Sequence, residues 1–174
     1  MITVLGTRGT IKNIDTFVQQ LLVFSKQEHL IIQAFDARLI YGKDHLISAT
    51  THAKRAFQQK TNATNSLALE ILLYAAGERQ IQKAIKKIGI KKGKQPIVFI
   101  ITDSVNQKSN TAIKKSVVQR LLKTFQLTID TTVIKGDMFT LKRFGITDVE
   151  LSTSPEEKYG DLILEKVALV DVIK

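Results

Sequence analysis

The chain has 174 residues, of which 44% are hydrophobic, and a formal net charge of +10. This length and apolar content suit one domain, residues 1–174, that buries its own core. The absence of cysteine excludes disulfides, thiolate zinc sites, iron–sulfur clusters and cysteine nucleophiles. Apolar runs fall short of the roughly 20 residues that span a bilayer, and the first residues do not resemble a signal peptide. We therefore expect a cytoplasmic protein, also nuclear if eukaryotic, with no membrane contact.

Strands and helices alternate through the first part of the sequence. Residues 2–5 predict a short strand, and apolar residues at helical spacing predict a helix over 13–26. Residues 29–35 are typical of a buried strand. After Gly42, a second stripe of apolar residues that ends at Phe57 indicates another helix.

A helical hairpin is predicted next, between Asn65 and Gly89. Asn65 is a plausible N-cap for a helix over 66–76, and Gly77 can supply the left-handed residue that ends it. The second helix is expected to begin at Glu78, because an acidic side chain in the first turn is favoured by the helix dipole. It is expected to stop at Gly89.

The second half of the sequence continues the alternation. Residues 96–102 form an apolar run rich in β-formers, 110–125 are amphipathic, and 127–134 are β-branched and alternating. A short helix is expected over 139–144 and a last helix over 156–173. Interspersed strands and helices without a linker or repeat predict an α/β (mixed α+β) fold, with a central mixed sheet packed by helices.

Positive charge concentrates on the second helix of the hairpin. Residues 79–94 contain seven basic residues and no acidic one. The simplest interpretation is a helix face exposed to solvent, but no acid lies among these lysines to offset the repulsion between their charges. We therefore favour an anion-binding surface for RNA or DNA. One helical face holds Ile81, Ala84, Ile85 and Ile88, and the opposite side holds Arg79, Lys83, Lys86 and Lys87.

The C-terminal segment has the opposite character. Residues 148–174 contain seven acids and three lysines. The apolar residues between Leu162 and Ile173 cover more than one helical face. Two interpretations remain open: complete burial within the core, or an exposed apolar surface that a partner protein covers.

Candidate catalytic groups are few and isolated. Residues 6–9, Gly-Thr-Arg-Gly, lack the patterns of a dinucleotide or phosphate loop and are expected to be plain turns. His45 and His52 are seven apart, whereas a helical zinc pair needs a spacing of four. Asp103 is expected in a turn or cap, and Glu70 is expected to pair with a lysine or arginine. We expect no catalytic residue, metal or cofactor.

The run NSLALEILLYAAGERQI at 65–81, followed by Ala84-Ile85 and Gly89-Ile90, resembles the signature of one family. This family is the PRPK-binding subunit of the KEOPS complex, which modifies tRNA. The resemblance extends in outline to the Phe144-Gly145-Ile146 turn and the apolar C-terminal helix.

The resemblance implies a non-catalytic subunit that binds the atypical small kinase of the complex directly and the catalytic threonylcarbamoyl transferase through it. It also implies recruitment of tRNA by its 3′ CCA end for threonylcarbamoyladenosine formation next to the anticodon. Alternatives are a stand-alone kinase regulator without RNA binding, or an enzyme with an unrecognised site. By position, the RNA-contact candidates are Asn65, Arg79, Gln80, Lys83, Lys86 and Lys87, and the kinase-contact candidates are Ile163, Leu164, Val167 and Leu169.

Overall fold

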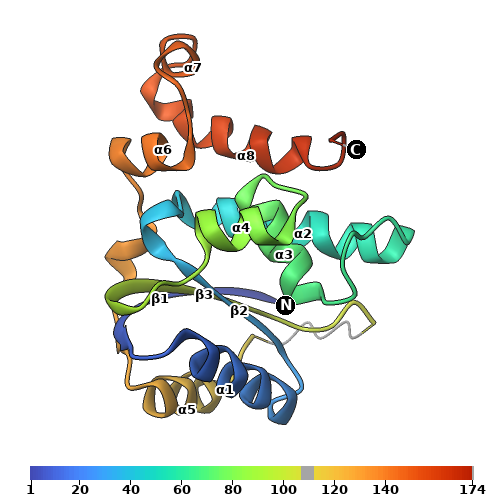
Figure 1. The fold of residues 1–174 in the computed structure, drawn as a ribbon, viewed down its shortest axis with the longest axis vertical. Coiled ribbons are helices and arrows are strands. Elements are labelled where there is room, and N and C mark those ends of the chain that lie inside the picture. The colour runs from blue at the N-terminus through green and yellow to red at the C-terminus, as the bar shows by residue number, and fades with distance from the viewer. Residues whose placement is uncertain (107–111, 174) are drawn as a thin grey trace.

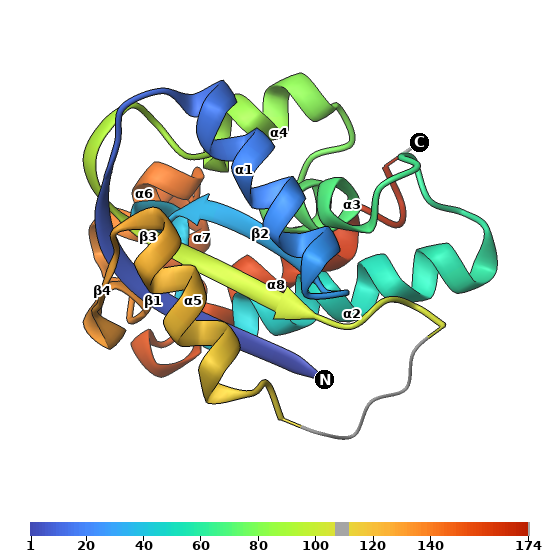
Figure 2. The same ribbon diagram turned by 90° about the horizontal axis from the view of Figure 1, so that it is seen from below.

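The computed structural model describes residues 1–106 and 112–173. Its sheet has the strand order β2-β3-β1-β4, and every pairing is antiparallel. The predicted fold class is confirmed, although the sheet was expected to be mixed and is antiparallel in its described pairings (Figure 2). The strands are β1 (Ile2–Ile11), β2 (Ile31–Asp36), β3 (Gly93–Thr102) and β4 (Thr128–Ile129).

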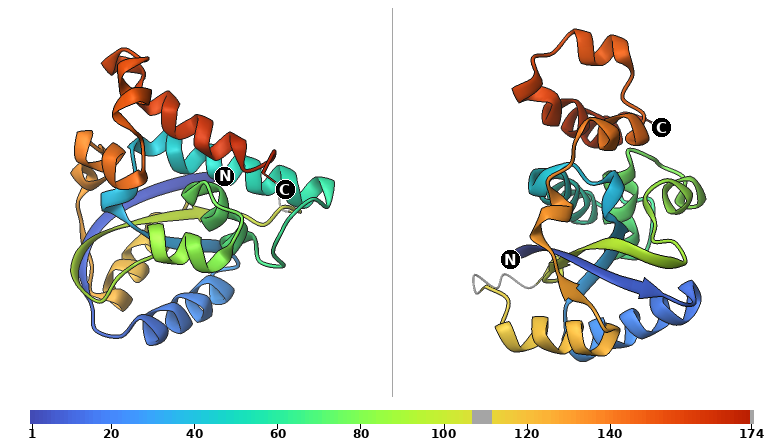
Figure 3. Two further views of the ribbon diagram at one scale, coloured as in Figure 1. Left: turned by 45° about the horizontal axis from the view of Figure 1, so that its top comes forward. Right: turned by 90° about the vertical axis from the view of Figure 1, so that its left-hand side faces the viewer.

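Helices cover both faces of the sheet (Figures 1 and 3). One face carries α1 (Ile14–Gln27) and α5 (Lys115–Phe125). The other face carries α2 (Gly42–Gln59), α3 (Leu67–Ala76) and α4 (Ile81–Ile88). Farther from the sheet lie α6 (Met138–Phe144), α7 (Asp148–Ser152) and α8 (Tyr159–Leu169), of which α8 packs on α2 and α3.

Strand β3 lies inside the sheet and has an apolar core on each side. Val98 and Ile100 belong to the cluster formed with α2, α3 and α8, whereas Ile97, Phe99 and Ile101 belong to the cluster formed with α1 and α5. Successive side chains of a strand point to opposite faces. Burial on both faces therefore explains why this segment is apolar without alternation.

Strand β1 is longer than predicted. It runs over Ile2–Ile11, so Gly6 and Gly9 lie within a strand and were wrongly predicted as turns. A Cβ atom on Gly6 would lie 2.5 Å from the carbonyl oxygen of Asp130, and one on Gly9 would overlap the side chain of Leu127. The two glycines let the chain around β4 approach β1 closely.

The region 127–134 contains much less strand than predicted. Only Thr128–Ile129 pair with β1, and a 3₁₀ turn, Thr131–Ile134, follows. Asp130 ends the strand, because its carboxylate accepts hydrogen bonds from the backbone N–H and the hydroxyl of Thr132. The same carboxylate forms an ion pair with Arg8 of β1, at 2.5 Å.

The hairpin has its predicted helices but different starting points. Ser66, and not Asn65, caps α3, since its hydroxyl accepts from the backbone N–H of Leu69 at 3.4 Å. Gly77 ends α3 in the left-handed conformation, as predicted (φ +66°). Glu78 continues this cap by donating its backbone N–H to the carbonyl of Leu73, so α4 begins only at Ile81.

The C-terminal half differs in its helix boundaries. The helix expected over 139–144 is confirmed as α6, which ends at Gly145 (φ +107°). Helix α5 begins at Lys115, and part of the amphipathic segment predicted from residue 110 lies outside the described residues. The last predicted helix divides into a 3₁₀ turn, Glu156–Lys158, and α8, which ends at Leu169.

Candidate nucleic-acid and partner interfaces

Helix α4 has two lysines exposed to solvent, and its opposite face packs against the core. Ala84 and Ile88 are fully buried against the core. Lys83 and Lys86 are exposed, and within 1–106 and 112–173 no carboxylate forms an ion pair with either of them. Their positive charge is therefore available to an anion from outside the chain.

Lys87 has a structural role instead. Its Nζ donates to the carbonyl of Ala76 at 2.7 Å and lies 4.1 Å from the centre of the Phe144 ring. Burial lowers the pKa of Lys87. This lysine caps the end of α3 and joins α4 to α6, so it differs from the freely exposed charge that the sequence suggested.

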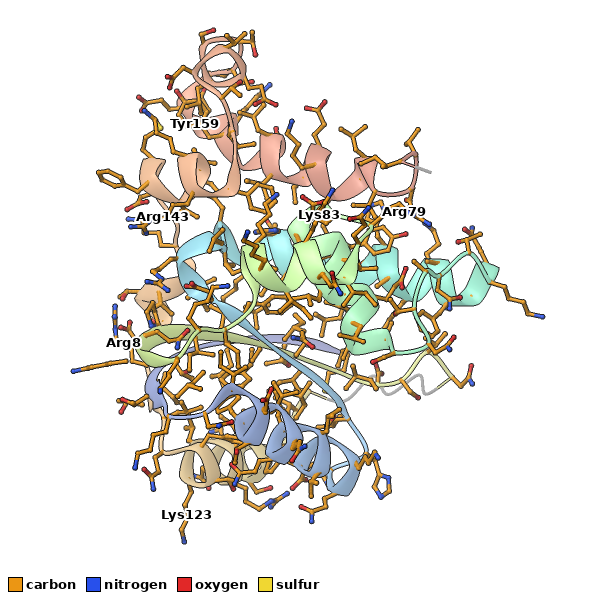
Figure 4. All side chains as sticks on the ribbon, in the orientation of Figure 1. Arg8, Arg79, Lys83, Lys123, Arg143 and Tyr159 are labelled. Carbon is orange, nitrogen blue, oxygen red and sulfur yellow. The ribbon has the colours of Figure 1, made fainter. Side chains whose placement is uncertain are left out.

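Arg79 also has a partner within the chain. It is half-buried, and its Nη1 donates to the backbone carbonyl of Val170 at 3.1 Å. Figure 4 shows Arg79 close to the C-terminal end of α8, while Lys83 lies farther along α4. Asn65 and Gln80, the remaining RNA-contact candidates, are exposed.

The four kinase-contact candidates divide between core and surface. Ile163 and Val167 are fully buried, Leu164 is half-buried, and Leu169 is 40% exposed. The two expectations for this segment therefore apply to different residues: Ile163 and Val167 hold α8 against the core, whereas Leu169 leads into an exposed apolar end. That end continues with Val172 and Ile173, which are 71% and 49% exposed.

A polar cluster that the sequence did not reveal holds this end in place. The carboxylate of Asp171 accepts hydrogen bonds from the hydroxyl of Tyr74, from Nδ1 of His52 at 2.9 Å and from Nη2 of Arg55 at 2.7 Å. Burial of Asp171 raises its pKa, but the three hydrogen bonds outweigh that effect and lower it. The cluster unites α2, α3 and the turn after α8.

An apolar groove of about 410 Å³ separates α1 from the hairpin, above β2, the outermost strand of the sheet in the described residues. The exposed side chains on its two walls belong to α1 and α4, where Ile85 is 48% exposed. Ile85 shares the predicted apolar face of α4 with Ala84 and Ile88, which are buried, but it stays exposed because α1 does not close over it. The groove is lined chiefly by Ile14, Val18, Leu22, Leu69, Ile85 and Ile90.

The isolated acidic and histidine side chains have partners within the chain. Glu70 is buried and accepts from the backbone N–H groups of Ala63 and Thr64, so the predicted lysine or arginine partner is wrong. Asp103 is buried and pairs with Lys54 at 2.5 Å. His45 donates to the carbonyl of Ala75 at 2.8 Å, and burial lowers its pKa to about 4.

Two kinds of site are absent from residues 1–106 and 112–173. Among them, no group of three or more His, Cys, Asp or Glu side chains could hold a metal ion. In the same part of the chain, no helix is both long enough and apolar enough to cross a membrane.

The fold thus carries an exposed basic helix and a separate exposed apolar surface after α8. Residues 9–171 match the model of the family described as kinase binding protein CGI-121, and the chain belongs to this family. The resemblance identified in the hairpin is thereby confirmed. Over 66 residues the chain is also 38% identical to the KEOPS complex subunit Cgi121 of Pyrococcus abyssi (strain GE5 / Orsay). This match covers 37% of the chain and 39% of the relative.

Proposed function

We propose that this chain is the non-catalytic subunit of a KEOPS complex that binds the kinase and recruits tRNA by its 3′ CCA end for threonylcarbamoyladenosine formation. The observation that carries the RNA part is the pair of exposed lysines on α4, Lys83 and Lys86, whose charge no described acid compensates. The family match supports the kinase part.

On the RNA side, phosphates and bases would be held by different groups. Lys83 and Lys86 would attract the phosphates, which supply affinity without sequence preference. The exposed side chains of Asn65 and Gln80 can form hydrogen bonds to bases or ribose. The apolar groove beside Ile85 is suited to unstacked bases, because single-stranded RNA is commonly held by stacking on apolar and aromatic surfaces.

On the kinase side, the contact would use the exposed apolar end of the chain. Leu164 and Leu169 would touch the kinase together with Val172 and Ile173. Ile163 and Val167 would contribute indirectly, by fixing α8 on the core. The threonylcarbamoyl transferase subunit would be reached through the kinase, and the reaction would take place outside this chain.

The experiment that tests this proposal is a binding titration with mature tRNA and with the same tRNA lacking its 3′ CCA. We expect a large loss of affinity on truncation, together with a steep salt dependence for the mature tRNA. Equal affinity for both RNAs would reject recognition of the 3′ end. If neither RNA binds while the kinase does, the chain is a kinase regulator without direct RNA binding.

A further inference from the structure

The two proposed binding surfaces meet at the turn after α8. Arg79 begins the segment that leads into the basic helix, yet it donates to the carbonyl of Val170 at 3.1 Å. The next residue, Asp171, accepts hydrogen bonds from Tyr74, His52 and Arg55. Two consecutive residues of this turn are thus held by side chains of α2, α3 and the hairpin connection.

These contacts fix a turn whose neighbouring side chains are exposed. Val170 is only 2% exposed, whereas Leu169, Val172 and Ile173 project into solvent. A turn with few buried contacts opens readily, so it needs a restraint to keep one arrangement. The contacts of Val170 and Asp171 provide that restraint and hold the apolar residues in a defined arrangement for a partner.

The same contacts orient Arg79 on the RNA side. A guanidinium has five N–H donors in a rigid plane, and the bond to Val170 engages one of them. The side chain borders a cavity of about 410 Å³ together with Arg55, Tyr74 and Asp171. Arg79 can therefore keep its bond to Val170 while it offers other donors to a phosphate.

We propose that Arg79 and Asp171 are positioning residues that couple the two binding events, so that the kinase and the RNA each tighten the binding of the other. This inference rests on the proposed function. A kinase bound to the turn after α8 removes the motion that these contacts leave and so also restrains Arg79 through Val170. The RNA then loses less conformational entropy on binding. Because such coupling is reciprocal, an RNA bound at Arg79 strengthens kinase binding by the same factor.

The test measures the affinity of this chain for its cognate kinase subunit with and without a saturating short single-stranded RNA ending in CCA. A short RNA is chosen because it is too small to bridge both proteins, and a titration of the kinase alone with this RNA checks that point. We expect the RNA to tighten kinase binding by about fivefold or more in the unmodified chain.

Three variants test whether the coupling between kinase and RNA binding depends on the contacts of the turn after α8. The coupling factor is the ratio of the kinase affinity with RNA to the kinase affinity without it. Asp171→Ala and the milder Tyr74→Phe should lower this factor toward one, while the binding of RNA alone stays measurable. Asp161→Ala, an exposed acid in the first turn of α8, is the matched control and should keep the full factor. Thermal unfolding of each variant shows whether it is folded.

The possible outcomes distinguish a failure of the proposed coupling from a failure of the proposed function. If both partners bind but neither changes the affinity of the other, or if Asp171→Ala retains the coupling, the inference is overturned and the proposed function stands. If the unmodified chain binds no RNA or no kinase, the proposed function fails, and the coupling fails with it.

Discussion

Lys83 and Lys87 lie one helical turn apart on α4, yet their environments are opposite. Lys83 is exposed and forms no ion pair with the described acids, whereas Lys87 lies over the ring of Phe144 and caps α3. Similar positions in the sequence thus serve different purposes: Lys83 is available to an external anion, and Lys87 stabilises the hairpin.

Reversing the charge of both exposed lysines should weaken tRNA binding. We expect Lys83→Glu with Lys86→Glu to lower tRNA affinity at least tenfold. The slope of log affinity against log salt concentration should also become shallower, by the equivalent of about two phosphate contacts, since each lysine neutralises one phosphate. Filter binding across a salt series measures both quantities. Lys123→Glu, on α5 at the opposite side of the molecule (Figure 4), is the control. An unchanged salt slope in the folded double variant would exclude α4 from the interface.

Removal of Lys87 should reduce stability rather than RNA affinity. Lys87→Met keeps most of the aliphatic chain but loses the hydrogen bond to Ala76 and the contact of the charge with Phe144. We expect the free energy of unfolding to fall by about 1–2 kcal/mol. Urea unfolding measures this change. A variant that keeps its stability but loses tRNA binding would show instead that Lys87 contacts RNA.

The exposed end of the chain should respond differently from its buried helix face. Leu169→Asp places a charge on a side chain that is already 40% exposed, so we expect kinase binding to be lost while the fold and tRNA binding persist. Ile163→Ala instead leaves a cavity in the core and should cost about 2–4 kcal/mol of stability. Co-purification with the kinase and thermal unfolding distinguish the two effects. Full kinase binding by Leu169→Asp would place the kinase contact elsewhere.

Acid should destabilise the fold through His45. The pKa of His45 is lowered from 6.5 to about 4 by burial, so between these values the unfolded chain binds a proton that the folded chain does not. Stability is therefore fully present above about pH 6.5 and is lost as the pH falls toward 4, by roughly 3 kcal/mol at most.

Urea unfolding between pH 7 and pH 4 checks this expectation. His45→Gln should show a shallower loss of stability with acid than the unmodified chain, while His29→Asn, at an exposed position, should not differ from it. Equal slopes for His45→Gln and the unmodified chain would mean that other groups govern the acid sensitivity.

Local sequence patterns predicted the elements that short-range chemistry controls. The hairpin follows from the apolar run of α3, the left-handed Gly77 and the one-sided apolar face of α4. The extent of β1 could not be predicted, because it depends on the distant strand β3, which pairs with β1 from Ile2 to Ile11, Gly6 and Gly9 included. The local sequence around these glycines is compatible with a turn as well as with a strand.

The candidate site was predictable only in part for the same reason. The charge of α4 is visible in the sequence, but the separate role of Lys87 depends on Phe144, which lies 57 positions away on α6. The contacts of Asp171 with His52 and Arg55 join residues separated by 119 and 116 positions. No periodicity or motif reports such contacts, and only the packing of α8 on α2 and α3 creates them.

The most direct test of the account is whether this chain brings tRNA to the kinase. Sedimentation of labelled mature tRNA with the cognate kinase subunit, with and without this chain, measures it. We predict that the tRNA sediments with the kinase only when the chain is present, and that removal of the 3′ CCA abolishes this complex. A kinase that carries the tRNA equally well without the chain, or a chain that binds tRNA and kinase only in separate complexes, would contradict the account.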